Sequence, residues 1–185
     1  MFTNSKEPMS LETELAKFWE WAGMTPETYP ENRGLGEWEA AYTEWETLYK
    51  AAHEAVAQLN TEFNHDLAQQ LVYALAIDNE SEKVREIIEE KLESKLRFVK
   101  KVINSNQPQA IWQIAELLGN AEVENGEQLL VNLIIRNDDK YIKRRALLSL
   151  GKVNHQKAVE LAQKFLKDTD PFLRLVSKEI IKKKV

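Results

Sequence analysis

The sequence predicts an all-α protein built from stacked pairs of helices. Glycine and proline are scarce, with 6 and 5 among 185 residues, whereas Ala, Leu, Glu and Lys are abundant. Apolar residues recur at steps of three and four without sustained period-two alternation, which favours helices over strands. A phrase is also repeated, because YIKRRALLSLG at 141–151 returns 31 residues later as FLRLVSKEII.

The N-terminal part predicts two helices separated by a loop. A helix at 11–23 begins after Ser10, a good N-cap, and ends at Gly23. Residues 25–36 contain two prolines and several turn-formers, so they are expected to be a loop. The second helix is expected at 36–60, where apolar residues follow one helical face.

The rest of the chain predicts further helices joined by turns of a few residues. These turns favour antiparallel neighbours. The expected helices are 65–78, 81–103 with Ser81 as N-cap, 109–119, 123–136, 139–151, 155–167 and 170–183.

The repeated phrase predicts a helix–turn–helix unit of roughly 30 to 35 residues. An acid precedes each copy as a helix cap, and Pro171 falls at the first helical position, where proline is tolerated. A small residue at 115, 146 and 177 allows two helices to approach closely. Each unit has an exposed apolar face, and stacking the units buries it.

The segments DDKYIKRRALLSLG and DTDPFLRLVSKEII resemble HEAT-like repeats, most closely the variety named after phycobilisome lyases. The resemblance covers about residues 107–185 well, 61–106 loosely and 1–60 not at all. It implies a right-handed α-α superhelix, a HEAT-like solenoid, in which acids and bases form a ladder between successive repeats. The matching residues are Asp139, Lys143, Asp170 and Arg174.

We therefore expect a tryptophan-rich acidic helical cap at 1–60, divergent from the repeats, and a single continuous repeat domain at 61–185. The resemblance does not fix a function, because the family includes scaffolds, inhibitors, assembly factors and a few lyases.

The net charge of −5 hides a division along the chain. Residues 1–137 hold 12 Lys and Arg against 24 Asp and Glu, whereas residues 138–185 hold 13 against 6. Solvation of each half by its own charges explains this division most simply, and self-association by charge asymmetry is the alternative. There is no cysteine, no signal-peptide pattern and no apolar run near the about 18 residues of a membrane span, so a cytoplasmic location without membrane contact is expected.

No catalytic constellation is visible. Glu62 and His65 share a Glu-x-x-His spacing, but a helical di-iron site needs that motif twice. The GLG at 34–36 is too short for a phosphate-binding loop. We expect no enzyme activity, no cofactor and no metal.

Nucleic-acid binding is an open alternative. Basic residues cluster in the C-terminal half, but the tryptophans lie in the acidic half, away from the charges that would hold phosphates. The basic residues concerned are Lys143, Arg144, Arg145, Lys152, Lys157, Lys164 and Lys167.

The tryptophan-rich segment has two interpretations. The residues Trp38, Tyr42, Trp45 and Tyr49 form a stripe at helical spacing, which favours an aromatic core over a ligand groove. Trp19 and Trp21 differ by two positions and cannot face the same way, so one of them is a candidate for partner binding.

The second helices of the repeats suggest a contact patch. Aligned on the following Asp, Leu129 corresponds to Glu160 and Leu133 to Lys164, so both leucines are expected to point outward. Second helices line the concave face of HEAT-like repeats, as the resemblance implies. We expect an apolar patch there for a protein partner, with cover by the helix at 81–103 as the alternative.

The function predicted from the sequence is a non-catalytic protein–protein interaction module that uses the concave face. The first alternative is an acidic immunity or inhibitor protein that blocks a basic toxin or enzyme site. The second is nucleic-acid binding through the basic half.

Overall fold

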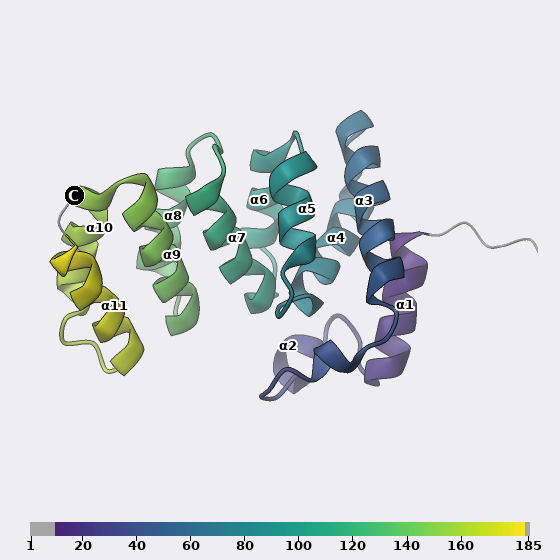
Figure 1. Cartoon of the computed structure of the whole chain (residues 1–185), viewed down its shortest axis with the longest axis horizontal. Coiled ribbons are helices and arrows are strands. Elements are labelled where there is room, and N and C mark those ends of the chain that lie inside the picture. The colour runs from purple at the N-terminus through teal and green to yellow at the C-terminus, as the bar shows by residue number, and fades with distance from the viewer. Residues whose placement is uncertain (1–9, 184–185) are drawn as a thin grey trace, which may run out of the picture. The chain divides into compact units, whose positions relative to one another are not determined.

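The computed structural model describes residues 10–183 and confirms the all-α, solenoid-type fold (Figure 1). No strand occurs within these residues. They form two compact units, which meet in sequence between Ala110 and Ile111. The right-handed sense of the superhelix and the expected boundary at residue 60 remain predictions; residue 60 lies inside unit 1, the first of these units. No helix of the described part is long and apolar enough to cross a membrane.

Unit 1 contains α1 to α6 and a 3₁₀ helix, η1. In this unit α3 packs against α1, α4 and α5, while α4 also packs against α1, α5 and α6. The bounds are α1 Leu11–Ala22, α2 Tyr29–Asn32, η1 Trp38–Ala41, α3 Trp45–Thr61, α4 His65–Ile77, α5 Lys83–Lys91 and α6 Lys95–Ile103.

The first helix has the expected ends. The Ser10 side chain accepts a hydrogen bond from the backbone N–H of Thr13, which satisfies one free donor of the first turn. Gly23 adopts the left-handed conformation, with φ 64°, and closes the C-terminus.

The expected helix at 36–60 is wrong, because the chain breaks between η1 and α3. Tyr42 is extended there, with ψ 134°. The indole N–H groups of Trp38 and Trp45 donate to the carbonyl oxygens of Arg33 and Glu39 at 2.9 and 3.1 Å. These bonds hold the chain in an irregular path. The expected loop at 25–36 also contains a short helix, α2.

The expected helix at 81–103 is also wrong, because it divides into α5 and α6 around Leu92. Leu92 is extended and fully buried. The Asn60 side chain donates to the Lys91 carbonyl at 2.8 Å and accepts from the Glu93 N–H at 2.9 Å. One amide thus satisfies backbone groups on both sides of the break, so a distant residue stabilises it. The N-cap position belongs to Glu82, and not to Ser81 as predicted.

Unit 2 contains the remaining helices, and α9 lies among α8, α10 and α11. The expected helix at 155–167 ends early, because its last part is a 3₁₀ turn, η2. The bounds are α7 Pro108–Asn120, which begins just before the unit boundary, α8 Gly126–Arg136, α9 Lys140–Val153, α10 His155–Ala162, η2 Gln163–Phe165 and α11 Pro171–Lys182.

The repeat is visible in the geometry of the caps. Asp139 accepts hydrogen bonds from the N–H groups of the first turn of α9, and Asp170 does the same for α11. The N–H groups of these two acids donate to the side chains of Asn137 and Asp168, both at 2.9 Å. Two turns 31 residues apart thus share one hydrogen-bond pattern. The repeated small residues, Ala115, Ala146 and Ser177, are all fully buried.

Gly119 marks a close approach of α7 to α9. A Cβ atom at Gly119 would lie 2.6 Å from the Ser149 Cβ and 2.9 Å from the Ser149 Cα. These distances are far below van der Waals contact, so the crossing requires glycine. At Gly151 the nearest atom, the Ala158 Cβ, would be 4.0 Å away.

We predict that Gly119→Ala lowers the free energy of unfolding by about 1–3 kcal/mol, the usual cost of overpacking. Gly151→Ala is the matched control and should be neutral or stabilising by up to about 1 kcal/mol, because alanine is the better helix former. Urea denaturation of both variants measures the difference. Equal stability of the two variants would contradict the close crossing.

Candidate interaction surfaces

An aromatic cluster in unit 1 is centred on Phe18 of α1. This ring is fully buried and lies 5.1 Å from Trp19, 5.2 Å from Tyr42 and 5.6 Å from Trp21, centroid to centroid. Of the aromatic stripe, Tyr42 and Tyr49 are buried, at 5% and 7% exposure, as expected for core, whereas Trp38 and Trp45 are half-buried. Phe18 itself was not singled out by the sequence analysis, because its spacing marks only an ordinary apolar position.

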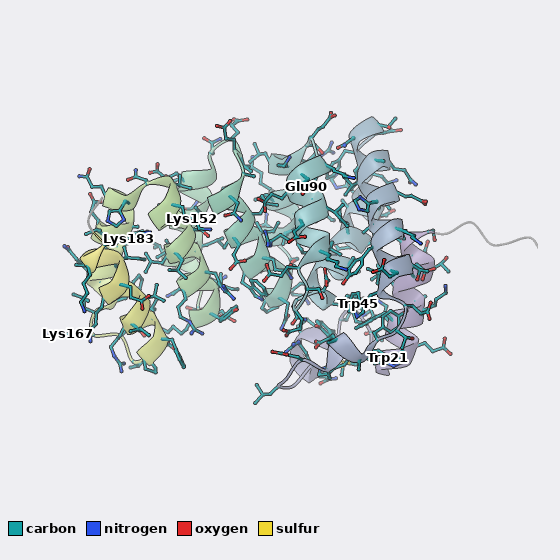
Figure 2. The ribbon with its side chains drawn as sticks, viewed as in Figure 1. Trp21, Trp45, Glu90, Lys152, Lys167 and Lys183 are labelled. Atoms are coloured by element: carbon teal, nitrogen blue, oxygen red, sulfur yellow. The ribbon has the colours of Figure 1, made fainter. Side chains whose placement is uncertain are left out.

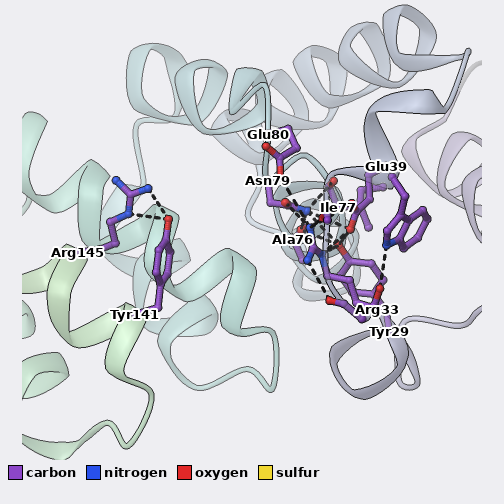
Figure 3. A network of polar contacts seen from close by, with 12 residues as sticks. Tyr29, Arg33, Glu39, Ala76, Ile77, Asn79, Glu80, Tyr141 and Arg145 are labelled. Atoms are coloured by element: carbon purple, nitrogen blue, oxygen red, sulfur yellow. Dashed lines mark hydrogen bonds and ion pairs between the residues drawn. The ribbon is translucent and has the colours of Figure 1, made fainter. Parts of the chain in front are cut away.

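A buried polar network lies beneath the irregular segment between α1 and α3 (Figure 3). The Tyr29 hydroxyl donates to Glu39 at 2.7 Å, and the Arg33 guanidinium donates to Glu39 at 3.1 Å and to Asn79 at 2.9 Å. The Asn79 amide donates to the Tyr29 hydroxyl and to the Ala76 carbonyl. The network therefore joins α2, η1 and the C-terminal end of α4.

The charges in this network are largely removed from water. Glu39 is 1% exposed, and burial and the hydrogen bond to Glu39 raise the pKa of the Tyr29 hydroxyl. Burial of an ion pair costs several kcal/mol per ion, which is recovered only with good geometry and additional hydrogen bonds. Here Arg33 also donates to the Gly36 carbonyl at 2.9 Å. The pair thus fixes one conformation of an irregular segment.

Trp21 lies at the surface edge of the aromatic cluster and is 45% exposed, whereas Trp19 is half-buried (Figure 2). A mainly apolar hollow of about 450 Å³ opens beside Trp21. We call it the Trp21 pocket; its lining is Trp21, Ala22, Met24, Arg33, Trp38 and Ala41. Of the predicted tryptophan pair, Trp21 is the one that points outward.

Asp78 forms a second buried polar site in unit 1. Its carboxyl accepts hydrogen bonds from the Tyr49 hydroxyl at 3.0 Å and from the Val84 N–H at 2.8 Å. Asp78 therefore caps the first turn of α5, although it precedes Val84 by six residues in the sequence. Burial raises the pKa of Asp78 to about 6, although the hydrogen bonds from Val84 and Tyr49 oppose the shift.

The predicted ladder in unit 2 is wrong in its partners. Asp139 and Asp170 cap their own helices, and Arg174 donates to the carbonyls of Asp168 and Thr169. Lys143 lies over the Phe165 ring, with 5.8 Å to the centroid. Ion pairs instead join Lys140 of α9 to Asp168 in the turn before α11, at 3.0 Å, and Arg145 of α9 to Glu116 of α7, at 2.6 Å.

Successive first helices of unit 2 are linked by alternating rings and guanidinium groups. Arg145 lies 5.0 Å from the Trp112 centroid and 4.9 Å from that of Tyr141, and it donates to the Tyr141 hydroxyl (Figure 3). Arg144 lies 5.0 Å from both the Tyr141 and Phe172 centroids. Cation–π contacts of this kind contribute about 0.5–1 kcal/mol each at exposed sites. The sequence analysis missed these rings, because it placed the relevant aromatic residues only in the acidic half.

The predicted leucine patch is not formed as expected. Leu133 is 4% exposed, so its outward placement is wrong, and Leu129 is half-buried. Ile135, two residues beyond Leu133 along α8, is 56% exposed. The aligned positions Glu160 and Lys164 are exposed. The alignment failed because Lys164 lies in η2, and a 3₁₀ turn advances about 120° per residue where an α-helix advances about 100°.

A groove of about 420 Å³ lies beside α9 and α11. Leu148, which is 39% exposed, and the buried Ile180 form its apolar part, and the buried Ser149 also lines it. We call it the α9–α11 groove. Its charged and titratable lining residues are Glu116, Arg145, Lys152, His155, Glu179 and Lys183.

The Glu62–His65 spacing does not form a common helical face. Glu62 follows the end of α3, whereas His65 begins α4 and contacts Arg97. Within residues 10–183, no three His, Cys, Asp or Glu side chains gather as ligands for a metal ion.

The described residues define an all-α, solenoid-type protein. Residues 127–177 match the family model for HEAT repeats. The match and the helical architecture together support a HEAT-like repeat protein, and the phycobilisome-lyase variety stays a prediction. Neither the curated proteins nor the solved structures give a significant match.

We predict that Arg33→Met lowers the free energy of unfolding by about 3–5 kcal/mol, because it leaves the Glu39 carboxylate buried without its partner. The double variant Arg33→Met/Glu39→Leu should recover a large part of this loss, since it removes both charges. Chemical denaturation of the wild type, both single variants and the double variant gives the coupling energy. A double variant no more stable than Arg33→Met would refute the charge explanation.

We predict that Asp78 makes stability depend on pH. Its folded pKa of about 6 exceeds the unfolded value of about 3.9, so folding takes up a proton between them. The contribution of Asp78 is therefore complete below about pH 4 and is lost as the pH rises through 6. Relative to Asp78→Asn, the wild type should lose about 2 kcal/mol between pH 4 and pH 6. Urea denaturation of both proteins between these pH values measures it, and a constant difference would contradict the shift.

Proposed function

We propose that this chain is a non-catalytic protein-binding module. HEAT repeats commonly mediate protein–protein interactions, which supports binding as the general role. The more specific role as a scaffold, with a partner held on a defined surface, is our inference.

One observation carries the proposal: a half-exposed tryptophan of α1 stands beside an apolar hollow whose other wall belongs to a segment fixed by a buried ion pair. Trp21 offers a large apolar surface, and tryptophan is enriched among residues that dominate interface energies. Arg33 and Glu39 hold the other wall of the Trp21 pocket, so little conformational freedom is lost when a partner binds. An apolar side chain of the partner would enter the pocket and cover Trp21.

The surface charge supports a basic partner. Residues 10–110 contain 19 Asp and Glu against 10 Lys and Arg, and the Arg33 charge is directed inward at Glu39. Such a field attracts a positively charged surface and speeds its association. An inhibitor of a basic toxin or enzyme is one specialised form of this function.

Nucleic-acid binding is less well supported by the contacts of unit 2. Some of its cations form ion pairs within the unit, since Lys140 pairs with Asp168, Arg145 with Glu116 and Lys157 with Glu160. Paired cations release fewer counterions on binding phosphate. A mobility-shift assay at low salt with random single-stranded and duplex oligonucleotides separates the two roles, and a shift at micromolar protein would favour nucleic acid.

We predict that Trp21→Ala weakens binding of the protein partner by about 30-fold or more, as expected for a central tryptophan. Affinity capture from a lysate of the source organism with quantitative mass spectrometry identifies the partner, and titration of the purified pair gives the affinity. The matched control is Ile135→Ala, which removes an exposed apolar side chain from unit 2. Equal affinity of the two variants would exclude the Trp21 pocket as the binding site.

A further inference from the structure

The turn at 34–36 exposes a leucine in a fixed position. Leu35 is 98% exposed and stands between Gly34 and Gly36, whose φ angles are 68° and 98°. Both angles lie in the left-handed region, which favours glycine. The sequence analysis considered this GLG only as a phosphate-binding loop and missed the leucine.

Contacts from Arg33 hold the turn on both sides. Its guanidinium donates to the Gly36 carbonyl at 2.9 Å, while the Trp38 indole donates to the Arg33 carbonyl at 2.9 Å. The turn is therefore anchored to the buried network, while other side chains leave Leu35 almost fully exposed to solvent. Burial of a leucine side chain by another molecule is worth about 1.5–3 kcal/mol, with little ordering cost for a fixed turn.

The surroundings of Leu35 are acidic. Glu31 and Glu37 are exposed, and burial and the Glu37 charge raise the pKa of the Glu80 carboxyl. The nearby cation, Arg33, lies 3.8 Å from Glu80 and also pairs with Glu39. A complementary surface would combine an apolar recess with a basic rim.

The α9–α11 groove has these properties. Its apolar part is Leu148 and Ile180, and its volume of about 420 Å³ can hold a leucine side chain. Lys152 and Lys183 border it (Figure 2). Arg145 is paired with Glu116, so the remaining rim charges are two lysines against Glu179.

We propose that Leu35 of one copy of this chain enters the α9–α11 groove of a second copy, so that copies associate head to tail. Size, polarity and charge match between the two surfaces. The interface is heterologous, because it joins two different surfaces, and a pair of copies retains one free Leu35 turn and one free groove for further association. This association does not depend on the Trp21 pocket, so it can fail while the proposed function stands.

The test uses two variants that are complementary. Leu35→Asp removes the anchor and keeps the groove, whereas Leu148→Asp blocks the groove and keeps the anchor. Each variant alone should be a monomer in sedimentation velocity at about 100 µM, the range of a weak interface. Their equimolar mixture should form a one-to-one complex, which an interface between identical surfaces cannot produce. The wild type should form larger species that dissociate as salt is raised.

Controls separate binding from folding. Ile135→Asp changes an exposed residue outside both surfaces and should associate like the wild type. Lys183→Glu reverses a rim charge at an exposed position and should weaken association without changing the helical circular dichroism spectrum. The proposal is overturned by a monomeric wild type, by association of Leu35→Asp alone, or by a mixture that stays monomeric while both variants are folded.

Discussion

The fold depends on the burial of each helix's apolar face against its neighbours. The α-helices of residues 10–183 have at most 17 residues, so they are marginal in isolation and need tertiary packing. Close packing in turn favours small side chains in the interior, and the repeated small residues Ala115, Ala146 and Ser177 are fully buried. The Ser177 hydroxyl donates to the Leu173 carbonyl at 2.7 Å, so its burial leaves no unpaired donor. The same constraint makes Gly119 necessary beside Ser149.

The irregular segment between α1 and α3 is stabilised by side-chain hydrogen bonds to its backbone. Backbone groups outside helices need other partners, and side chains supply them here: Arg33, Trp38 and Trp45 all donate to carbonyl oxygens. A buried network in which most groups are satisfied specifies one arrangement, because any slip leaves a charge without a partner. The aromatic rings packed around Phe18 stabilise this arrangement further, because they bury apolar surface. A rigid, non-repetitive surface is the result, and such surfaces commonly carry binding residues.

The features predicted correctly from the sequence are those that depend on nearby residues, such as helix caps. Ser10, Gly23, Asp139 and Asp170 act as caps, as expected from their positions beside apolar runs. Features that depend on distant residues were missed: Asn60 stabilises the break at Leu92, and Asp78 caps α5 in place of Ser81. Periodicity identifies an apolar face but does not say which neighbour covers it, so the placement of Leu133 was wrong. Of the candidate site, the outward tryptophan was foreseen in principle, whereas the Arg33–Glu39 pair and Leu35 were not, because neither follows a helical pattern.

Charge has opposite consequences in the two units. In unit 2 several cations contact carboxylates, carbonyls and ring faces of the same unit, as Arg144 does with the rings of Tyr141 and Phe172. Such contacts lower the field that the unit presents to solvent, so its basic composition overstates its attraction for polyanions. In unit 1 acids outnumber bases, and the Arg33 guanidinium is paired with the buried Glu39 carboxylate. Repulsion among like carboxylates opposes folding, and an approaching cationic surface relieves it. Trp21 and Leu35 add exposed apolar area to this acidic surface, so unit 1 presents both kinds of contact that protein interfaces combine.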